Sequence, residues 1–254
     1  MLDGANKIVV TISWDDSHPA NRRLAELLGR YNLRGTFYLD KRNTSAKEIK
    51  ELSQLMEIGA HSLNHPDLTK LDLKEAEEEV VGSKKWLEEA IGRPVQMFAY
   101  PFGHYNAEIK GIVRQAGFIG ARTTEEFCLK QPEDFFETGT ALHIYPFPLR
   151  KRNDKDYHLS RFLFQPLAGK FLKILKLGLP WSSFLNWPEL AKNTFDYVLK
   201  NGGVYHLWGH AFEMEKYGLW PDLENIFKYI SGRENVSYLT NSQVLENEDI
   251  DSTR

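Results

Sequence analysis

The sequence has one cysteine and no long apolar run, and both absences narrow the class of protein. Because Cys128 is alone among 254 residues, an internal disulfide framework is excluded, which fits a reducing compartment. No apolar run approaches the roughly 20 residues that a membrane-spanning helix needs. The first residues, MLDGANK, also lack the basic and apolar regions of a secretion signal. We therefore expect a cytoplasmic protein.

An excess of positive charge is also absent. The chain carries 32 basic and 35 acidic residues, so its formal charge of −3 gives no general attraction to nucleic acid. The apolar content of 42% and the aromatic content of 13% are sufficient for a substantial core. We expect a single domain over residues 1–245, followed by a frayed acidic tail at residues 246–254.

The sequence does contain a regular alternation of strand-length apolar runs with stretches of helical period. This alternation is typical of βα units and a parallel sheet. It predicts strands at residues 8–14, 35–39, 57–62, 95–101, 118–123, 204–208 and 236–240, and helices at residues 21–31, 46–56, 73–91, 107–117, 187–203 and 222–232. The size suits a (β/α) barrel, with a doubly wound open sheet as the alternative.

Reactive side chains follow several of the predicted strands. One aspartate or histidine in such a position is usually a turn or structural residue. Several together fit a barrel, because a barrel gathers its chemistry at the C-terminal ends of its strands. The candidates are Asp15 and Asp16, His61 and His65, the turn at residues 100–103, Arg122, His206 and His210.

His61 and His65 have an H-x-x-x-H spacing. If the segment forms one helical turn that Pro66 ends, both imidazoles project on the same side. Two unrelated surface histidines are the alternative. Two histidines and a carboxylate from Asp15 or Asp16 make a three-ligand metal set, which leaves open positions for water and substrate.

Four motifs, in order, resemble the polysaccharide deacetylase family, also known as the NodB homology family or carbohydrate esterase family 4. They are TISWDD, HSLNHP, FAYPFG and HLWGH, and the resemblance runs from Lys7 to Thr240. The resemblance implies an α/β fold, a distorted (β/α)7–8 barrel. It also implies an enzyme that removes acetyl groups from an amino sugar or saccharide.

The resemblance further implies roles for individual residues. Asp15 is then the general base, and Asp16, His61 and His65 hold a divalent metal, most often zinc. Cobalt, nickel and manganese suit the same ligands. Backbone N–H groups of the turn at residues 100–103 are expected to stabilise the oxyanion.

The acid that protonates the leaving amine is either His206 or His210. The family's late motif fits His206 in VYH as well as it fits His210, but His210 lies where a strand emerges at the barrel rim. We favour His210, and Glu213 follows it closely enough to orient the ring. The other predicted substrate contacts are Tyr100, Pro101, Phe102, Gly103, His18 and Trp208.

The third motif departs from the family at Ala99, where an arginine usually pairs with the catalytic aspartate. Without that cation, either Asp15 titrates at a higher pH or another cation takes the role. Arg122, at the end of the next predicted strand, is our candidate. A surface arginine at a strand end is the alternative.

Residues 143–188 form a predicted irregular insertion. A basic amphipathic helix within it, at residues 166–181, suits a membrane surface or a lipid-linked sugar. A helix that covers the barrel has a similar pattern, and we favour that interpretation. The predicted apolar stripe is Leu167, Phe171, Ile174 and Leu175, with Lys173 and Lys176 on the other side and Lys170 at the border.

Taken together, the residues favour a metal-dependent N-deacetylase of a saccharide. A hydrolase of a non-sugar amide or imide is the nearest alternative among enzymes. A carbohydrate-binding pseudoenzyme is the alternative from another class, because the usual arginine is missing at Ala99. The sequence predicts neither the identity of the sugar nor the oligomeric state.

Overall fold

A computed structural model describes residues 7–149 and 159–249, and the side chains of residues 159–166 and 247–249 are not part of the description. In this part of the chain, eight strands form one parallel sheet in the order β5-β4-β3-β2-β1-β7-β6, with β8 paired to β1. The strands are β1 (Ile8–Asp15), β2 (Thr36–Leu39), β3 (Glu57–Ala60), β4 (Met97–Ala99), β5 (Gly120–Arg122), β6 (Leu142–His143), β7 (Gly203–His210) and β8 (Val236–Tyr238).

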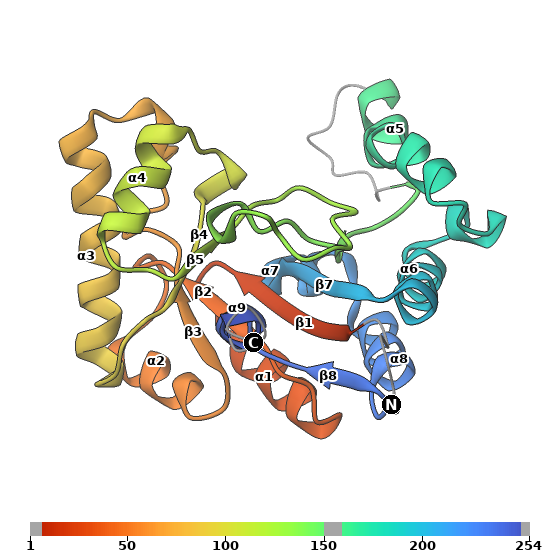
Figure 1. Cartoon of the computed structure of the whole chain (residues 1–254), viewed down its shortest axis with the longest axis horizontal. Coiled ribbons are helices and arrows are strands. Elements are labelled where there is room, and N and C mark those ends of the chain that lie inside the picture. Colours follow the sequence, from red (N-terminus) through yellow and green to blue (C-terminus); the bar gives the residue numbers. More distant parts are fainter. Residues whose placement is uncertain (1–6, 150–158, 250–254) are drawn as a thin grey trace.

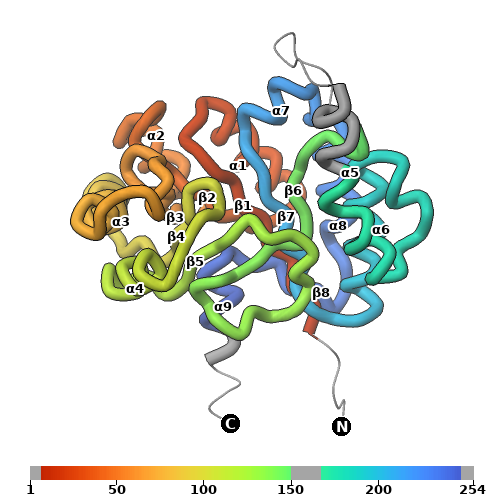
Figure 2. The backbone as a smooth tube through the Cα atoms, turned by 90° about the horizontal axis from the view of Figure 1, so that it is seen from above, coloured from red at the N-terminus to blue at the C-terminus, as the bar shows by residue number. Residues whose placement is uncertain are grey.

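Six of the helices flank the two ends of the curled sheet. α2, α3 and α4 flank one end of it, and α5, α6 and α8 flank the other (Figures 1 and 2). The α-helices are α1 (Asn21–Arg30), α2 (Ala46–Ser53), α3 (Leu73–Ile91), α4 (Ala107–Gln115), α5 (Leu159–Lys176), α6 (Trp187–Asn201), α7 (Ala211–Tyr217), α8 (Trp220–Ile230) and α9 (Asn241–Asp249). Short 3₁₀ turns are η1 (Leu68–Lys70), η2 (Pro101–Gly103), η3 (Phe135–Glu137) and η4 (Trp181–Phe184).

The segment between β5 and β6 closes the gap between the two sheet edges. The amide of Thr138 donates to the carbonyl of Ala121 at 3.0 Å, on the β5 side. Three residues later, the amide of Ala141 donates to the carbonyl of His206 in β7 at 2.8 Å. Figure 2 shows this segment, in green, lying between β5 and β6. The predicted distorted (β/α) barrel is therefore confirmed, with an irregular segment in place of regular strand pairing at the seam.

β1 is the central strand, and its two faces have different chemistry. Val10, Ile12 and Trp14 are buried in the apolar core. The alternating residues Thr11, Ser13 and Asp15 bear the polar groups, because side chains alternate along a strand. Thr11 accepts a hydrogen bond from Asn241 of α9 at 2.8 Å, and Ser13 lies 2.8 Å from His206 of β7. A polar row thus runs through the barrel interior and ends at Asp15.

Two predicted helix boundaries are confirmed by their capping residues. The Asp72 carboxylate accepts from the amide of Glu75 at 2.8 Å, and the Glu75 carboxylate accepts from the amide of Asp72 at 3.3 Å. These two bonds form the capping box of α3. Gly92 ends α3 at φ 73°, a left-handed conformation that favours glycine.

The C-terminal residues differ from the prediction of a frayed tail. Helix α9 extends to Asp249, so the expected start of the tail at residue 246 lies inside a helix. Leu245 packs against Tyr38 and Met97, and Asn241 accepts a hydrogen bond from the Tyr38 hydroxyl at 2.8 Å. Burial of this apolar face against the strands stabilises α9, a contact that composition does not reveal. Residues 250–254 lie outside the described part.

The predicted insertion at residues 143–188 contains α5 and η4, while residues 150–158 within it lie outside the description. Ile174 is fully buried, but Phe171 and Leu175 are exposed, so the predicted apolar stripe is only partly covered. Lys170, predicted at the border, is buried and paired with Glu126. Lys170 and Lys173, which also contacts Glu126, therefore face the body of the protein, whereas Lys176 is exposed. Among the described residues, no helix is long and apolar enough to cross a lipid bilayer.

Candidate active site

The aspartate pair at the end of β1 is divided between two environments. Asp15 is the last residue of the strand, and its side chain is buried inside the barrel. Asp16 has a left-handed backbone, with φ 68°, and its side chain is 19% exposed. Because the backbone changes direction between them, the neighbouring carboxylates contact different partners.

The loop that carries His61 and His65 is not the helical turn that the spacing suggested. Ser62 and His65 have φ values of 60° and 58°, which interrupt any right-handed turn. The hydroxyl of Ser62 accepts from the amide of His65 at 2.9 Å, and Glu79 of α3 accepts from the amides of residues 63 and 64. The two rings still meet, with centroids 4.7 Å apart. Side-chain acceptors, rather than helix geometry, bring the histidines together.

Asp16, His61 and His65 fit a divalent metal. Asp16 Oδ1 lies 3.5 Å from His65 Nε2 and 3.9 Å from His61 Nε2, and the three ligand atoms lie within 4.8 Å of one another. Tetrahedral zinc with bonds of about 2.0–2.1 Å holds its ligand atoms roughly 3.3 Å apart, so small movements suffice. His61 Nδ1 donates to the carbonyl of Ala99 at 2.8 Å, which leaves Nε2 as the unprotonated, ligating nitrogen.

Asp40 and Arg42 complete the surroundings of Asp16, and the sequence analysis did not identify them. Arg42 Nη2 lies 3.0 Å from Asp16 Oδ1 and 2.9 Å from Asp40 Oδ2. Asp40 is buried directly after β2, and the pairing with Arg42 outweighs burial and lowers its pKa. The signal was the one used for the other candidates, a carboxylate that directly follows a strand.

Arg122 contacts Asp15 inside the barrel. Its Nη2 donates to Asp15 Oδ1, and its guanidinium lies 5.3 Å from the centroid of the Tyr38 ring and 4.8 Å from that of Trp208. The Arg122 side chain is 0% exposed, so the alternative of a surface arginine is wrong. Burial between two aromatic rings fixes the guanidinium against the carboxylate.

Neighbouring cationic groups strongly favour the ionised form of the Asp15 carboxyl group. Burial by itself raises the pKa of a carboxyl group, but the positive charge of Arg122, together with His61 and His210, lowers the pKa of Asp15 to about 2. Of the two alternatives for an Asp15 without an arginine at position 99, the higher pKa is therefore wrong. Arg122 is the other cation that the sequence analysis named.

The two late histidines have opposite properties. His210 ends β7 beside Asp15, its partner in the β1–β7 register. Its Nδ1 donates to Glu213 at 2.8 Å, and this bond outweighs burial and raises the pKa of His210. His206 lies inside the barrel, 2.8 Å from the hydroxyl of Ser13, and burial lowers its pKa to about 3. Only His210 combines a position at the strand end with a stabilised cationic form.

His143 is a site residue that the sequence analysis missed. Its Nε2 lies 2.9 Å from Glu213 Oε2, the same oxygen that binds His210. The ring stacks on Trp208 with centroids 4.1 Å apart, and Trp187 donates to the carbonyl of His143 at 3.2 Å. The strand that carries it, β6, has only two residues within an irregular stretch, so no periodicity marked it.

Two of the predicted substrate contacts are turned away from the site. The Tyr100 hydroxyl donates to the carbonyl of Phe136 at 3.0 Å, and the Tyr100 amide donates to the carbonyl of Arg122 at 3.2 Å. Trp208 is 6% exposed beneath His143, because residues 206, 208 and 210 of β7 share one face of the strand. The prediction that these two side chains contact the substrate is therefore corrected: both are buried and pack against residues of the site.

The rest of the predicted turn remains at the site. Phe102 has φ 59°, is 57% exposed, and its ring lies 4.6 Å from that of His65. Gly103 donates to the carbonyl of Tyr100 at 2.8 Å, and Pro101 has no N–H. Within the described residues, the Phe102 N–H has no hydrogen-bond partner, so it is the one donor of this turn that is available to a ligand.

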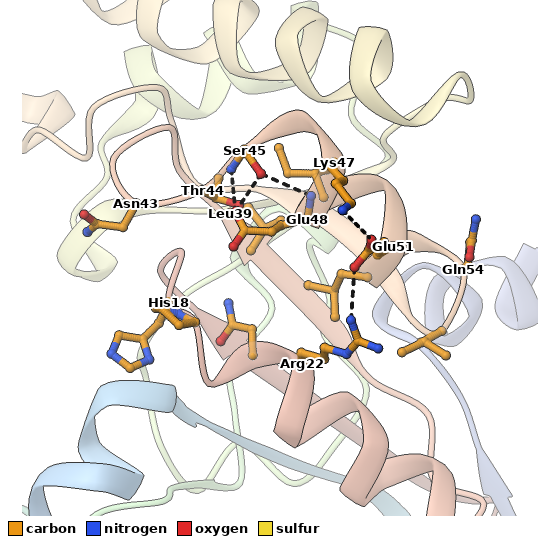
Figure 3. A pocket seen from close by; sticks show the side chains of 15 residues that line it. His18, Arg22, Leu39, Asn43, Thr44, Ser45, Lys47, Glu48, Glu51 and Gln54 are labelled. Carbon is orange, nitrogen blue, oxygen red and sulfur yellow. Dashed lines mark hydrogen bonds and ion pairs between the residues drawn. The ribbon is translucent and has the colours of Figure 1, made fainter.

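His18 lines a pocket of about 600 Å³ between α1 and α2. Its Nδ1 accepts from the amide of Ala20 at 3.2 Å. His18 and Asn43 lie on one side of the pocket, and the ion pair of Arg22 with Glu51 joins the two helices on another (Figure 3). The predicted contact residue therefore lines this pocket, whose lining includes neither the aspartate pair nor the two histidines of the metal set.

Residues 3–121 match the family model described as polysaccharide deacetylase. The resemblance to the polysaccharide deacetylase family is therefore confirmed. The matched part contains both aspartates, both histidines of the H-x-x-x-H motif and the turn at residues 100–103.

Two curated relatives show how much of the polysaccharide deacetylase resemblance lies in sequence. The chitooligosaccharide deacetylase of Azorhizobium caulinodans is 29% identical over 120 residues, which are 44% of this chain and 56% of that protein. The peptidoglycan-N-acetylmuramic acid deacetylase PdaC of Bacillus subtilis is 30% identical over 110 residues, 41% of this chain and 24% of that protein. The matches span about half or less of the length of these relatives.

Solved structures extend the polysaccharide deacetylase fold over nearly the whole chain. A Mycobacterium smegmatis protein assigned as a polysaccharide deacetylase superposes with a TM-score of 0.68 and 15% identity, over 99% of this chain and 93% of that one. The Xyl-CE4 domain of a multidomain xylanase from the hindgut metagenome of Trinervitermes trinervoides gives 0.59 and 13%, over 96% and 92%. Because these identities are low, the superpositions show that the chain shares the fold of these proteins and nothing further.

Proposed function

We propose that the protein is a metal-dependent hydrolase that removes an N-acetyl group, or a related acyl group, from an amino sugar in a saccharide. The family supports carbohydrate deacetylation. The observation that carries the finer proposal is the division of the aspartate pair. Asp15 faces Arg122 inside the barrel, while Asp16 faces His61 and His65 at its mouth.

Asp16, His61 and His65 are proposed to hold the metal. When bound, a divalent cation polarises the acyl carbonyl and makes a coordinated water more acidic. Zinc is the first choice for two imidazoles and one carboxylate, with cobalt, nickel and manganese also suitable. Arg42 contacts both Asp16 Oδ1 and Asp40 Oδ2, so it would keep its Asp40 partner if a cation took its place at Asp16.

Asp15 is proposed as the general base. Arg122 engages its Oδ1, so Oδ2, which lies 3.9 Å from His61 Nε2, is the oxygen that faces the metal ligands. A pKa of about 2 keeps the carboxylate ionised at neutral pH, so it accepts the proton of the attacking water without first losing one. Such a weak base needs an acidified water, which is why base and metal act together.

His210 is proposed as the general acid, and Phe102 as the oxyanion donor. Glu213 holds His210 Nδ1 at 2.8 Å, which directs Nε2 away from Glu213 and stabilises the ring in its protonated form. The protonated ring gives its Nε2 proton to the departing amine. The free N–H of Phe102, on a turn beside His65, is available for the developing negative charge on the carbonyl oxygen.

The two alternatives are separable by experiment. A non-sugar amide or imide hydrolase needs the same metal and base, so only the substrate distinguishes it. A carbohydrate-binding pseudoenzyme is an alternative with precedent in the fold, because a mutant with restored activity of BA3943, a pseudoenzyme of carbohydrate esterase family 4, superposes with a TM-score of 0.59 and 14% identity, over 95% of this chain and 69% of that one. The complete set of base, ligands and acid in this chain favours an enzyme.

The test is acetate release from N-acetylglucosamine oligomers by protein loaded with one equivalent of zinc. We expect activity in the native protein and a loss of at least about a hundredfold in Asp15→Asn, which keeps the shape of the base and removes its charge. Asp222→Asn, at the partly exposed start of α8, is the matched control. Stoichiometric zinc with no acetate from any N-acetylated sugar contradicts the proposal, and release from a cyclic imide instead supports the first alternative.

The compartment of the protein and the kind of substrate are proposed from the sequence. We propose a cytoplasmic saccharide as substrate and no nucleic acid partner, with a single domain that includes α9 and so extends beyond the predicted end at residue 245. The pocket beside His18 is a suitable place for a neighbouring sugar, since polar side chains such as Asn21 and Asn43 line it and Asn21 donates to the carbonyl of Asp16. Contact of residues 166–181 with a membrane or a lipid-linked sugar stays a prediction.

A further inference from the structure

A second cluster of metal-ligating side chains lies beside the proposed acid. His143 Nε2 and His210 Nδ1 approach the same oxygen of Glu213, at 2.9 and 2.8 Å. All three atoms lie within 4.8 Å of one another, as in the Asp16, His61 and His65 set. The proposed mechanism uses His210 and Glu213 but gives His143 no task.

The cluster has the dimensions of a cation site. Ligand atoms on a tetrahedral zinc are roughly 3.3 Å apart, so the two bonds to Glu213 need to lengthen by only about 0.5 Å. The side chains of His143 and His210 are each 19% exposed, which leaves an approach for a hydrated cation. Glu213 is 9% exposed, so a cation there replaces two hydrogen bonds by stronger contacts with a largely desolvated carboxylate.

His143 is held in place from several sides. Its ring lies nearly parallel to that of Trp208, at 14°, with centroids 4.1 Å apart. Its carbonyl accepts from Trp187, and its amide donates to Glu126 at 2.7 Å. A ligand whose ring and backbone are both fixed loses little conformational entropy when a metal binds.

We propose that His143, His210 and Glu213 form a second divalent-cation site, suited to zinc, whose occupation inhibits the enzyme. The inhibitory part rests on the proposed function, because it requires His210 to be the acid. The binding part stands on the geometry alone. The site is weaker than the first, since a cation must first displace the two hydrogen bonds to Glu213.

The inhibition follows from the atoms that the cation occupies. For a cation to bind His210 Nδ1, the proton that this nitrogen donates to Glu213 in the free protein must be released to solvent, and the freed lone pair then binds the cation. The imidazole then has a proton on Nε2 alone and is neutral. A neutral imidazole is a poor acid, so the departing amine loses its proton source. The first metal and Asp15 are unaffected.

Equilibrium dialysis with zinc alone tests the binding, without any substrate. We expect two zinc ions per native chain, one after His61→Ala with His65→Ala, and one after His143→Phe. Phenylalanine at position 143 keeps the ring on Trp208 and removes the ligating nitrogen. The control is His104→Ala, which removes an exposed histidine 3.0 Å from Asp67 that has no third ligand, and it should leave two zinc ions bound.

The inhibition is tested by acetate release. For each variant, we compare the rate at high zinc concentration with the rate at one equivalent of zinc. At a zinc concentration of ten times the second Kd, about 90% of the sites are occupied, so native activity should fall roughly tenfold from its value at one equivalent. The ratio should stay near one in His143→Phe and fall as in the native protein in His104→Ala.

Each outcome decides between the two proposals. One zinc ion per native chain at saturation, or two in His143→Phe, overturns the second site. Two zinc ions with the expected loss in His143→Phe, but no deacetylation at any zinc level, supports the second site and contradicts the proposed function. Two zinc ions without inhibition overturns the inhibitory role.

Discussion

Ala99 and Arg122 are register partners on adjacent strands, β4 and β5, at the level of the candidate site. The family's usual arginine position is occupied by a fully buried alanine, and the guanidinium that reaches Asp15 comes from the next strand. A small side chain at position 99 leaves space for the neighbouring arginine. The cation is therefore present in the barrel, supplied one strand away from its usual position.

The first prediction concerns this exchange. Arg122→Ala leaves the buried Asp15 carboxylate unpaired, which should cost about 3–5 kcal/mol of unfolding free energy and raise the pKa of Asp15. Restoring the usual position with Ala99→Arg in the same chain should recover part of both stability and acetate release. Thermal denaturation and acetate assays measure this, with the exposed Arg34→Ala as control. If Arg122→Ala alone keeps native stability and activity, the exchange is not functional.

The second prediction concerns the proposed metal ligands. His61→Ala should reduce zinc binding at the first site by more than His65→Ala, because His61 is buried and its Nδ1 is fixed by Ala99. Chelation should abolish acetate release in the native protein, and one equivalent of zinc should restore it. Metal analysis after dialysis provides the measurement. Undiminished activity after complete removal of metal contradicts the assignment.

The third prediction concerns the pH dependence of the proposed acid. Glu213 raises the pKa of His210, so activity should persist above the ordinary histidine pKa of about 6.5 and fall as pH rises through the raised value. Glu213→Gln removes the charge, lowers the pKa of His210, and should shift the alkaline limb of kcat to lower pH. Glu215→Gln, on the exposed side of α7, is the matched control. An unchanged limb in Glu213→Gln argues against His210 as the acid.

The fourth prediction concerns the buried histidine that the mechanism does not use. Burial lowers the pKa of His206 from 6.5 to about 3, so the unfolded chain binds a proton there that the folded chain does not. The stability from this residue is present above pH 6.5 and is lost as pH falls toward 3, by up to roughly 1.4 kcal/mol per pH unit. His206→Gln should flatten this part of the urea-denaturation profile. The same slope in native and variant protein contradicts the prediction.

The fifth prediction concerns the surface of α5 and η4. Trp181 and Leu172 are 76% and 65% exposed, the apolar components that a membrane contact needs. Lys170 and Lys173 are both engaged by Glu126, however, so the basic component of the predicted pattern is weakened. Sedimentation with anionic phospholipid vesicles should show binding that Leu172→Glu and Trp181→Glu reduce. Equal sedimentation of native protein with and without vesicles excludes the contact.

Much of the fold was predictable because period and capping are local properties. The Asp72 capping box and the strand at β1 needed only neighbouring residues. The loop of His61 and His65 was not predictable, since its left-handed residues depend on Ser62 and on Glu79 from a different helix. His143 was missed because its place beside Glu213 results from closure of the barrel seam, which no local pattern encodes.

The pairing of β1 with strands from both halves of the chain has a consequence for biosynthesis. Its C-terminal part pairs with β2, its N-terminal part with β8, and its whole other edge with β7. Residues 203–238 are therefore required before the strand that bears the aspartates is fully hydrogen-bonded. Such long-range pairing slows folding, so the pairing of β1 is complete only after β7 and β8 have been synthesised. A chain truncated before β7 should contain both aspartates but lack the strand that pairs with the whole of β1 and places His210 beside Asp15.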